Sequence, residues 1–339
     1  MPRKNLLPRL AFLMWLGMAG LASAQQTAPP APQQPPQPMD NQKEPSAAPG
    51  QPADSSTDDE GGFVLKKEVQ EVVLHATVVD EHRRLATHLD KASFTVLQDG
   101  RQQTITSFHR DDVPVAIGIL IDNSGSMRDK RDQVNQAVMN LIRASNPQDK
   151  VFVVNFTQNP YLDQDFTSDE SLLEKALHQT SMGGSTALYD AVVSAAAHLK
   201  NNAPLDKRIL LVITDGNDNM SRVTLQEAVR KLQDKSGPTL YAVGLMGLTA
   251  QHEGRDALQK LADATGGTAF FPDSLDQVSD ITRSLAHDIR SQYTIAYKPQ
   301  GGGSGAGAYH PIVVEARAPG LGKLTVRTRN GYYNGEMVR

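Results

Sequence analysis

The chain contains no cysteine, which excludes disulfides, thiolate metal sites and a lipid-anchoring cysteine of the lipoprotein type. The absence does not decide the redox compartment, because many exported proteins also lack cysteine. Charge of one sign is scarce too: the net charge is −4 over 339 residues, without a long run of either sign. Neither a nucleic-acid surface nor a basic membrane footprint is therefore expected. Aromatic residues make up only 5%, but a hydrophobic content of 39% supports a real core.

Catalytic motifs are missing as well. The nine histidines are scattered, without a His-Glu-x-x-His pair, and no Walker sequence occurs. Ser124 and Ser126 could be considered as nucleophiles, but no histidine accompanies them in a recognisable elbow. The sequence therefore predicts a protein that is not an enzyme.

The N-terminus predicts export. Arg3, Lys4 and Arg9 precede an apolar run over residues 10–21, which is followed by Ala22-Ser23-Ala24. This order is typical of a secretory signal over residues 1–24, with cleavage after Ala24 and a periplasmic or extracellular mature protein. The alternative is an uncleaved membrane anchor, although the run is shorter than the roughly 20 residues that span a bilayer. No later apolar stretch approaches that length, so we expect no transmembrane span in the mature protein.

A proline-rich segment follows over residues 25–62. It holds nine of the chain's twenty prolines and almost no large apolar residue. Such a segment cannot bury enough surface to offset its ordering entropy, so it is expected to be a disordered tether.

The next segment, residues 63–112, alternates apolar and polar residues with a period of two. This period predicts short strands, and Asp99-Gly100 is a hairpin turn signal. Strands return in the C-terminal segment, residues 291–339. Neither segment is long enough to bury a convincing core alone, so we expect them to form one β-sandwich interrupted by the domain between them. Two independent small sheets are the alternative. The strands are expected at residues 72–74, 77–79, 94–97, 104–108, 293–297, 311–317 and 323–327.

Between these segments, residues 113–290 alternate buried strands with helices. Continuous apolar runs predict strands that are buried on both faces. The residues at 167–170 and 224–227 both fit the capping box that opens a helix. This alternation favours a mainly parallel α/β sheet with helices on both faces, and residues 161–166 favour an antiparallel edge strand. The expected strands are at residues 115–121, 151–154, 209–213, 240–243 and 268–271, and one helix is expected at 129–144.

Oxygen-bearing side chains cluster where these strands end. Asp122-x-Ser124-x-Ser126 follows the first buried strand, and Asp215 follows another. A glycine-rich loop between them presents Thr186, with the neighbouring Ser185 as the alternative hydroxyl. Ligands bind at the carboxyl ends of strands in open α/β sheets, so these groups are expected to meet. An all-oxygen set suits Mg²⁺, Mn²⁺ or Ca²⁺ better than Zn²⁺.

This set resembles the metal-ion-dependent adhesion site of von Willebrand factor A domains at all five positions. The resemblance implies a Rossmann-like α/β fold over residues 113–290. It also implies that Ser124, Ser126 and Thr186 bind the ion directly, with Asp122 and Asp215 acting largely through water. The flanks, including Asp99-Gly100 and the motif at residues 329–333, resemble a bacterial von Willebrand A-related family with β flanks.

The functional expectation is a metal-dependent binding module for adhesion or partner capture. Mg²⁺ is the expected ion, and the partner is a protein that supplies an Asp or Glu carboxylate to it. A structural component of a cell-envelope complex is the first alternative, and a metal-dependent hydrolase is the second. Asp218 is close enough in sequence to adjoin the site, but we expect it to be a solvated loop residue.

Overall fold

The structure is a computed structural model of the chain and describes residues 37–38, 71–110, 112–178, 182–246, 252–300 and 307–335. The expected signal and most of the expected tether lie outside these residues. Within the tether, Gln37–Pro38 forms the two-residue strand β1, which pairs antiparallel with β8 (Pro160–Thr167). The expectation of a disordered tether over residues 25–62 stays a prediction. The edge strand β8 offers unpaired backbone groups, which an extended segment can satisfy.

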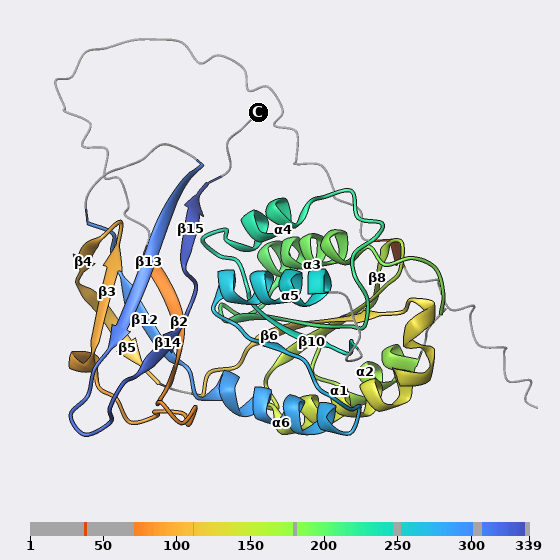
Figure 1. Ribbon diagram of the computed structural model, residues 1–339, viewed down its shortest axis with the longest axis horizontal. Coiled ribbons are helices and arrows are strands. Elements are labelled where there is room, and N and C mark those ends of the chain that lie inside the picture. Colours follow the sequence, from red (N-terminus) through yellow and green to blue (C-terminus); the bar gives the residue numbers. More distant parts are fainter. Residues whose placement is uncertain are drawn as a thin grey trace, which may run out of the picture. The chain divides into compact units, whose positions relative to one another are not determined.

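A seven-stranded sheet in the order β1-β8-β7-β6-β9-β10-β11 forms the centre of the α/β domain (Figure 1). The five strands from β7 to β11 in this order are parallel, and β8 is antiparallel to β7, as the sequence predicts. The chain runs from β6 to β7 on one side and later continues at β9 on the other. The carboxyl ends of β6 and β9 therefore border the point where the strand order reverses, where ligands bind in open α/β sheets. The strands are β6 (Ala116–Asp122), β7 (Lys150–Phe156), β9 (Arg208–Thr214), β10 (Thr239–Gly244) and β11 (Ala269–Phe270).

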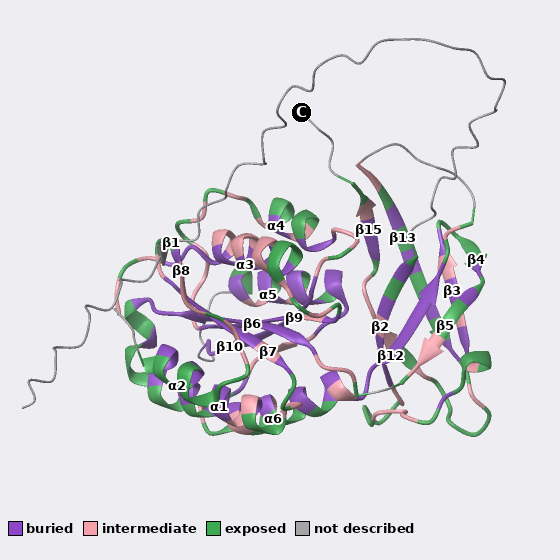
Figure 2. Ribbon diagram, turned by 180° about the vertical axis from the view of Figure 1, so that it is seen from behind, coloured by how far each residue is buried: buried purple, intermediate pink, exposed green. Residues whose placement is uncertain are grey.

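Helices cover both faces of this sheet, and the strands between them are buried (Figures 1 and 2). One layer packs on a core that includes Ile119, Val138 and Leu285, and the other packs on a core that includes Leu120, Val192 and Leu258. The first layer contains α1 (Arg131–Ala144), α2 (Glu170–His178) and α6 (Gln277–Arg290). The second contains α3 (Leu188–Asn202), α4 (Leu225–Leu232) and α5 (His252–Thr265). The mainly parallel sheet with helices on both faces is confirmed.

The two predicted capping boxes have different outcomes. At α4 the Thr224 side chain accepts from the Glu227 backbone and the Glu227 side chain accepts from the Thr224 backbone, so this box is confirmed. At α2 the prediction is wrong, because Asp169 accepts from the backbone of the first helical turn instead. A carboxylate directly before the helix meets the free N–H groups more readily than Thr167, which lies two residues further back. The helix expected from residue 129 begins at Arg131, because a 3₁₀ helix, η2 (Gly125–Lys130), precedes it.

The flanking segments build two four-stranded sheets, with the orders β14-β2-β12-β5 and β15-β13-β3-β4. Each sheet combines strands from before and after the α/β domain, and their inner faces share one core that includes Leu74, Val96 and Ile295. The predicted β-sandwich is confirmed. Residues 72–79 form one strand instead of the two expected, since Ala76 continues the buried face. The strands are β2 (Val72–Val79), β3 (Phe94–Gln98), β4 (Arg101–Gln103), β5 (Ile105–His109), β12 (Tyr293–Tyr297), β13 (Ala308–Ala316), β14 (Thr325–Arg327) and β15 (Gly331–Asn334).

The α/β domain is inserted between two strands that lie side by side. The chain leaves the sandwich after β5 and returns with β12, and these strands pair antiparallel with Phe108 opposite Ile295. Insertion at adjacent points leaves both halves of the sandwich in register. The 3₁₀ helix η1 (Lys91–Ser93) precedes β3, and the predicted hairpin at Asp99-Gly100 joins β3 to β4. Both hairpin residues have positive φ, +53° and +72°, as a two-residue hairpin turn requires.

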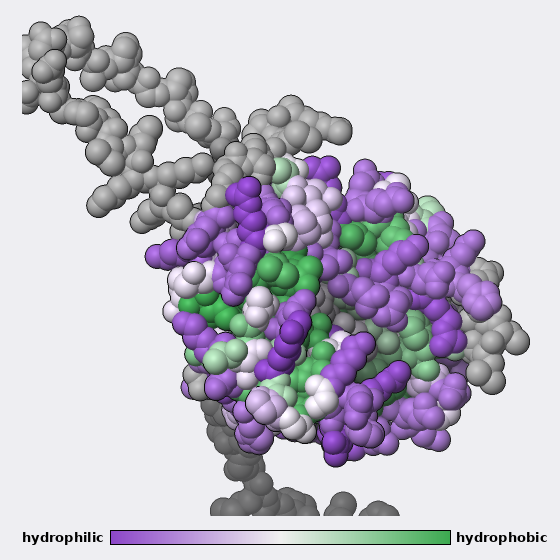
Figure 3. Space-filling model, turned by 60° about the vertical axis from the view of Figure 1, so that its left-hand side comes forward, coloured by the Kyte–Doolittle hydropathy of each residue, from purple (hydrophilic) through white to green (hydrophobic). Residues whose placement is uncertain are grey.

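The sandwich contributes hydrophobic side chains to the molecular surface. Val73 on β2 and Val313 on β13 are 44% and 52% exposed. Figure 3, turned toward this side of the molecule, shows hydrophobic side chains among hydrophilic ones. Among the described residues, none of the helices combines the length and the apolar character needed to cross a bilayer.

The sandwich is held to the α/β domain by hydrogen bonds to backbone carbonyls at the loop between α4 and β10. The Arg329 guanidinium donates to the carbonyls of Asp234, Lys235 and Gly237 at 3.0, 2.8 and 2.5 Å. Beside it, Tyr333 N donates to the Gln233 carbonyl at 2.9 Å. A single cationic side chain therefore donates to three carbonyls of this loop.

Replacing Arg329 by Met tests this contact. The variant keeps most of the apolar stem but removes three hydrogen bonds to backbone carbonyls, so we expect the free energy of unfolding to fall by about 2 kcal/mol. Urea unfolding followed by circular dichroism measures the change. Arg317→Met is the control, because the Arg317 side chain is 88% exposed and, within the described residues, forms an ion pair with Glu315 alone, so its loss is expected to cost less than about 0.5 kcal/mol. Equal losses in both variants would contradict a fastening role for Arg329.

Candidate metal centre

The first loop of the site begins at the last residue of β6. Asp122 is fully buried, and both of its carboxylate oxygens are held by neutral donors. Oδ1 accepts from Ser124 N at 2.8 Å, and Oδ2 accepts from Thr214 Oγ1 at 2.5 Å. Burial raises the pKa of Asp122, and the nearby Asp215 carboxylate adds to that rise. The fold therefore fixes the direction of this carboxylate but supplies no salt bridge to it among the described residues.

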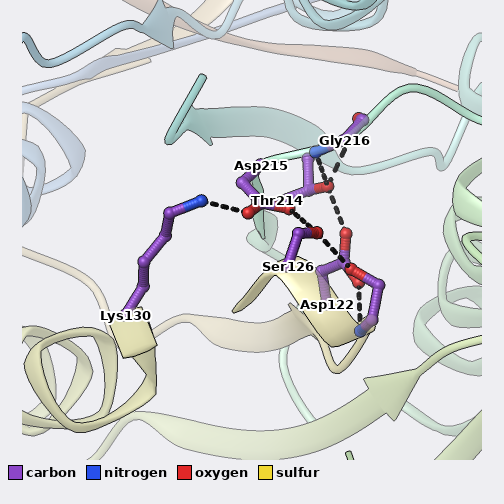
Figure 4. A network of polar contacts seen from close by, with 7 residues as sticks. Asp122, Ser126, Lys130, Thr214, Asp215 and Gly216 are labelled. Carbon is purple, nitrogen blue, oxygen red and sulfur yellow. Dashed lines mark hydrogen bonds and ion pairs between the residues drawn. The ribbon is translucent and has the colours of Figure 1, made fainter. Parts of the chain in front are cut away.

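The second carboxylate belongs to the loop after β9, the neighbour of β6 in the sheet. Asp215 Oδ1 accepts from Ser126 Oγ at 2.8 Å, and the Ser124 and Ser126 hydroxyls lie 3.1 Å apart (Figure 4). The other oxygen of Asp215, Oδ2, pairs with the Lys130 ammonium. Two loops therefore bring two carboxylates and two hydroxyls into one hydrogen-bonded chain.

The third loop, before α3, positions Thr186. Gly183 and Gly184 have φ values of +135° and +91°, which side chains with a Cβ rarely adopt, so glycine permits this turn. Thr186 is buried, and Asn219 contacts it twice: Asn219 Oδ1 accepts from Thr186 N at 2.8 Å, and Asn219 N donates to Thr186 O at 3.0 Å. A Cβ added at Gly216 would lie 3.6 Å from Thr186 Oγ1 and 4.0 Å from Asp122 Oδ2, so both oxygens border Gly216.

The buried Arg131 guanidinium contacts residues that adjoin the first loop. Arg131 donates to the Asn123 and Asn155 side-chain oxygens and to the Leu177 carbonyl. Burial lowers its pKa to about 10, so it remains charged near neutral pH. The Asn123 backbone carbonyl accepts from Gly183 N at 2.9 Å, so Asn123, whose side chain Arg131 holds, links the first loop to the third.

The structure thus brings all five predicted residues to the carboxyl edge of β6 and β9. Their chemistry fits a hard divalent cation, since the set consists of two carboxylates and three hydroxyls. The described part of the chain contains no group of three or more His, Cys, Asp or Glu that could hold a metal. The present set has only two carboxylates and depends on hydroxyls for its other ligands. Ser124, Ser126 and Thr186 would be the neutral ligands, and Asp122 and Asp215 would supply the charge.

The neighbouring residues follow the sequence analysis in part. Thr186 is buried while Ser185 is half-buried, and the choice of Thr186 over Ser185 stays a prediction. Asp218 is half-buried and accepts from the Ser221 hydroxyl and from Tyr189 N, so the expectation of a solvated carboxylate is wrong. A loop carboxylate beside free N–H and O–H donors forms local hydrogen bonds more readily than it stays hydrated.

Four supporting residues were missed by the sequence analysis: Thr214, Asn219, Lys130 and Arg131. Thr214 directly precedes Asp215, so its place at the strand end was the one available signal. The other three act through contacts between loops that are distant in sequence, such as the 33 residues that separate Asn219 from Thr186. Sequence spacing carries no sign of such contacts.

Thr214→Val tests the support of Asp122. The substitution preserves shape but removes a donor to a buried carboxylate, so we expect the unfolding free energy in EDTA to fall by about 2 kcal/mol. Urea unfolding measures it. Thr282→Val is the matched control: Thr282 is also fully buried, but its hydroxyl donates to the Ser279 carbonyl within α6 and not to a carboxylate of the described residues. A loss no larger than that of Thr282→Val would show that Thr214 does not support Asp122.

Comparison with known proteins assigns the α/β domain. Residues 116–284 match the family model for the von Willebrand factor type A domain. Calcium-activated chloride channel regulator 1 of Mus musculus is 27% identical over 228 residues, which are 65% of this chain and 22% of that protein. The chain therefore spans less than a quarter of that relative's length.

Two solved structures are also similar. A von Willebrand factor type A protein from Catenulispora acidiphila has a TM-score of 0.47 at 15% identity, with 80% of this chain and 76% of that chain covered. Proximal thread matrix protein 1 from the mussel byssus, with a zinc-occupied metal-ion-dependent adhesion site, has a TM-score of 0.47 at 17% identity, with 57% and 50% covered. The family match, with the fold described above, identifies this chain as a von Willebrand factor A domain protein.

Proposed function

We propose that this chain is an exported, non-enzymatic binding protein that captures a protein ligand through a divalent cation. Mg²⁺ is the proposed ion, with Mn²⁺ and Ca²⁺ as alternatives of the same chemistry. The family match supports a protein-interaction module. The observation that carries the finer proposal is the meeting of three hydroxyls and two carboxylates at one sheet edge, with Ser126 Oγ 2.8 Å from Asp215 Oδ1.

The balance of charge in this set favours binding a carboxylate. Ser124, Ser126 and Thr186 are neutral, so they would leave most of the charge of a bound cation uncompensated. A divalent cation held there would supply an open position that attracts an Asp or Glu carboxylate from another protein. The chain's own residues would orient that contact, because Thr214 and Asn219 fix Asp122 and Thr186.

The surroundings of the two serines support a binding role over a catalytic one. Nucleophilic catalysis by serine needs a base within hydrogen-bond reach. The hydroxyls of Ser124 and Ser126 bond each other and Asp215, and neither pairs with a histidine in the part of the chain that the structure describes.

Metal should stabilise the folded protein. At a hundredfold excess over the dissociation constant, linkage adds about 2.7 kcal/mol, so Mg²⁺ or Mn²⁺ should raise the melting temperature and EDTA should reverse the rise. Asp122→Ala should abolish the rise and Thr186→Ala should weaken it, while Ser185→Ala serves as the control. Differential scanning calorimetry with and without metal measures each response. An undiminished response in Asp122→Ala would place the ion elsewhere and contradict the proposal.

Capture of a partner should depend on the same ion. The mature protein, immobilised and incubated with cell-envelope extract in Mg²⁺, should retain a partner that EDTA releases. The Asp122→Ala bait should retain little of it, and the Ser185→Ala bait should behave like the wild type. Quantitative mass spectrometry of the eluates compares the baits. Retention that is equal in Mg²⁺ and EDTA would favour the purely structural envelope role instead.

A further inference from the structure

Lys130 places a positive charge directly at the candidate metal centre. It is the last residue of η2, four residues after Ser126, and its ammonium forms an ion pair with Asp215 Oδ2 (Figure 4). The Asp215 side chain is only 2% exposed, whereas the Lys130 side chain is 27% exposed. The Asp215 carboxylate is therefore almost completely shielded from solvent, whereas the Lys130 side chain that balances its charge is partly exposed.

The two carboxylates of the site differ in their partners. Among the described residues, the donors to Asp122 are neutral and come from Ser124 and Thr214. Asp215 has Ser126 on one oxygen and Lys130 on the other. Arg131 interacts electrostatically with Asp122, but its guanidinium is committed to Asn123, Asn155 and Leu177. Of these two cations, Lys130 is the one that can move, because its flexible side chain is 27% exposed.

A divalent cation and the Lys130 ammonium would compete for the negative charge of Asp215. Like charges within a few ångströms repel, and the repulsion is strong where water is largely excluded. The affinity of divalent sites depends on the charge count around the ion. A lysine that neutralises Asp215 therefore reduces the negative charge that attracts an incoming cation.

We propose that Lys130 is an internal counter-ion of the metal centre, which balances Asp215 without metal and is displaced when a divalent cation binds. This inference rests on the proposed metal-dependent function. Lys130 then sets the affinity for the ion: it stabilises the metal-free fold and weakens metal binding, so that the site fills only where divalent cations are abundant.

A simple positioning role predicts the opposite effect. If Lys130 mainly held Asp215 in place for the ion, its removal would loosen Asp215 and weaken metal binding. If the pair were an ordinary surface salt bridge, its removal would change little, because exposed pairs contribute on the order of 0–1 kcal/mol. The direction of the change in metal affinity therefore distinguishes the three roles.

Titration calorimetry of the full mature chain with MgCl₂, repeated with MnCl₂, is the test. Lys130→Met keeps the apolar stem and removes the charge, and Lys130→Gln is a second neutral variant. Both should bind Mg²⁺ about tenfold more tightly than the wild type, which corresponds to about 1.4 kcal/mol. Lys130→Arg should retain the wild-type affinity within about twofold, because the competing charge is kept.

Arg128→Met is the matched control. Arg128 is exposed in the same 3₁₀ helix, so its loss changes the net charge equally without touching the ion pair. It should leave the Mg²⁺ affinity within about twofold of wild type. In EDTA, both neutral Lys130 variants should melt below the wild type, and at saturating Mg²⁺ this difference should vanish.

Unchanged or weaker Mg²⁺ binding in the neutral Lys130 variants would overturn the inference, and so would an equal gain in Arg128→Met. In either case the metal-dependent function would stand, because the wild type still binds. Failure of the wild type and all variants to bind Mg²⁺ or Mn²⁺ would overturn the proposed function and this inference together.

Discussion

Two carboxylates, Asp122 and Asp215, lie at the carboxyl ends of the adjacent parallel strands β6 and β9, and the side chains of both are almost fully buried. Burying two negative charges close together is unfavourable unless cations or donors balance them. Hydroxyl and backbone donors hold Asp122, while Lys130 and Ser126 hold Asp215. The surrounding loops are shaped by this requirement, and a divalent cation would satisfy it further.

The α/β domain that carries this site is joined to the sandwich at more than one place. The α/β domain enters and leaves through β5 and β12, which are paired neighbours in one sandwich sheet. On the far side of the insertion, Arg329 fastens the sandwich to the loop between α4 and β10. Attachment at two places opposes free rotation of the domain, so the sandwich and the metal centre are expected to move together.

Patterns that depend on local chemistry were predictable from the sequence. The continuous apolar run of β6 marks a strand buried on both faces, and Asp99-Gly100 marks a hairpin turn. The sandwich itself followed from a size argument, because neither flank could bury a core alone. The five candidate ligands were predictable because each lies at a strand end or in a glycine-loosened loop, where topology brings them together.

Features that depend on contacts between distant loops were not predictable. Asn219 and Arg131 support the site only through the places where their loops meet, and Lys130 gains its role from a carboxylate 85 residues away. Local competition between acceptors also changes one helix start: Asp169 displaces Thr167 as the cap of α2. The pairing of Gln37–Pro38 with β8 likewise depends on an available edge strand and not on strand-forming residues.

The central claim is that one divalent cation binds between the loops after β6 and β9 and before α3. Crystals of the mature protein grown in MnCl₂, measured at the manganese absorption edge, test it most directly. We expect one strong anomalous peak in contact with the hydroxyls of Ser124, Ser126 and Thr186. An anomalous map with no peak at these hydroxyls, or with its main peak elsewhere in the protein, would contradict the claim.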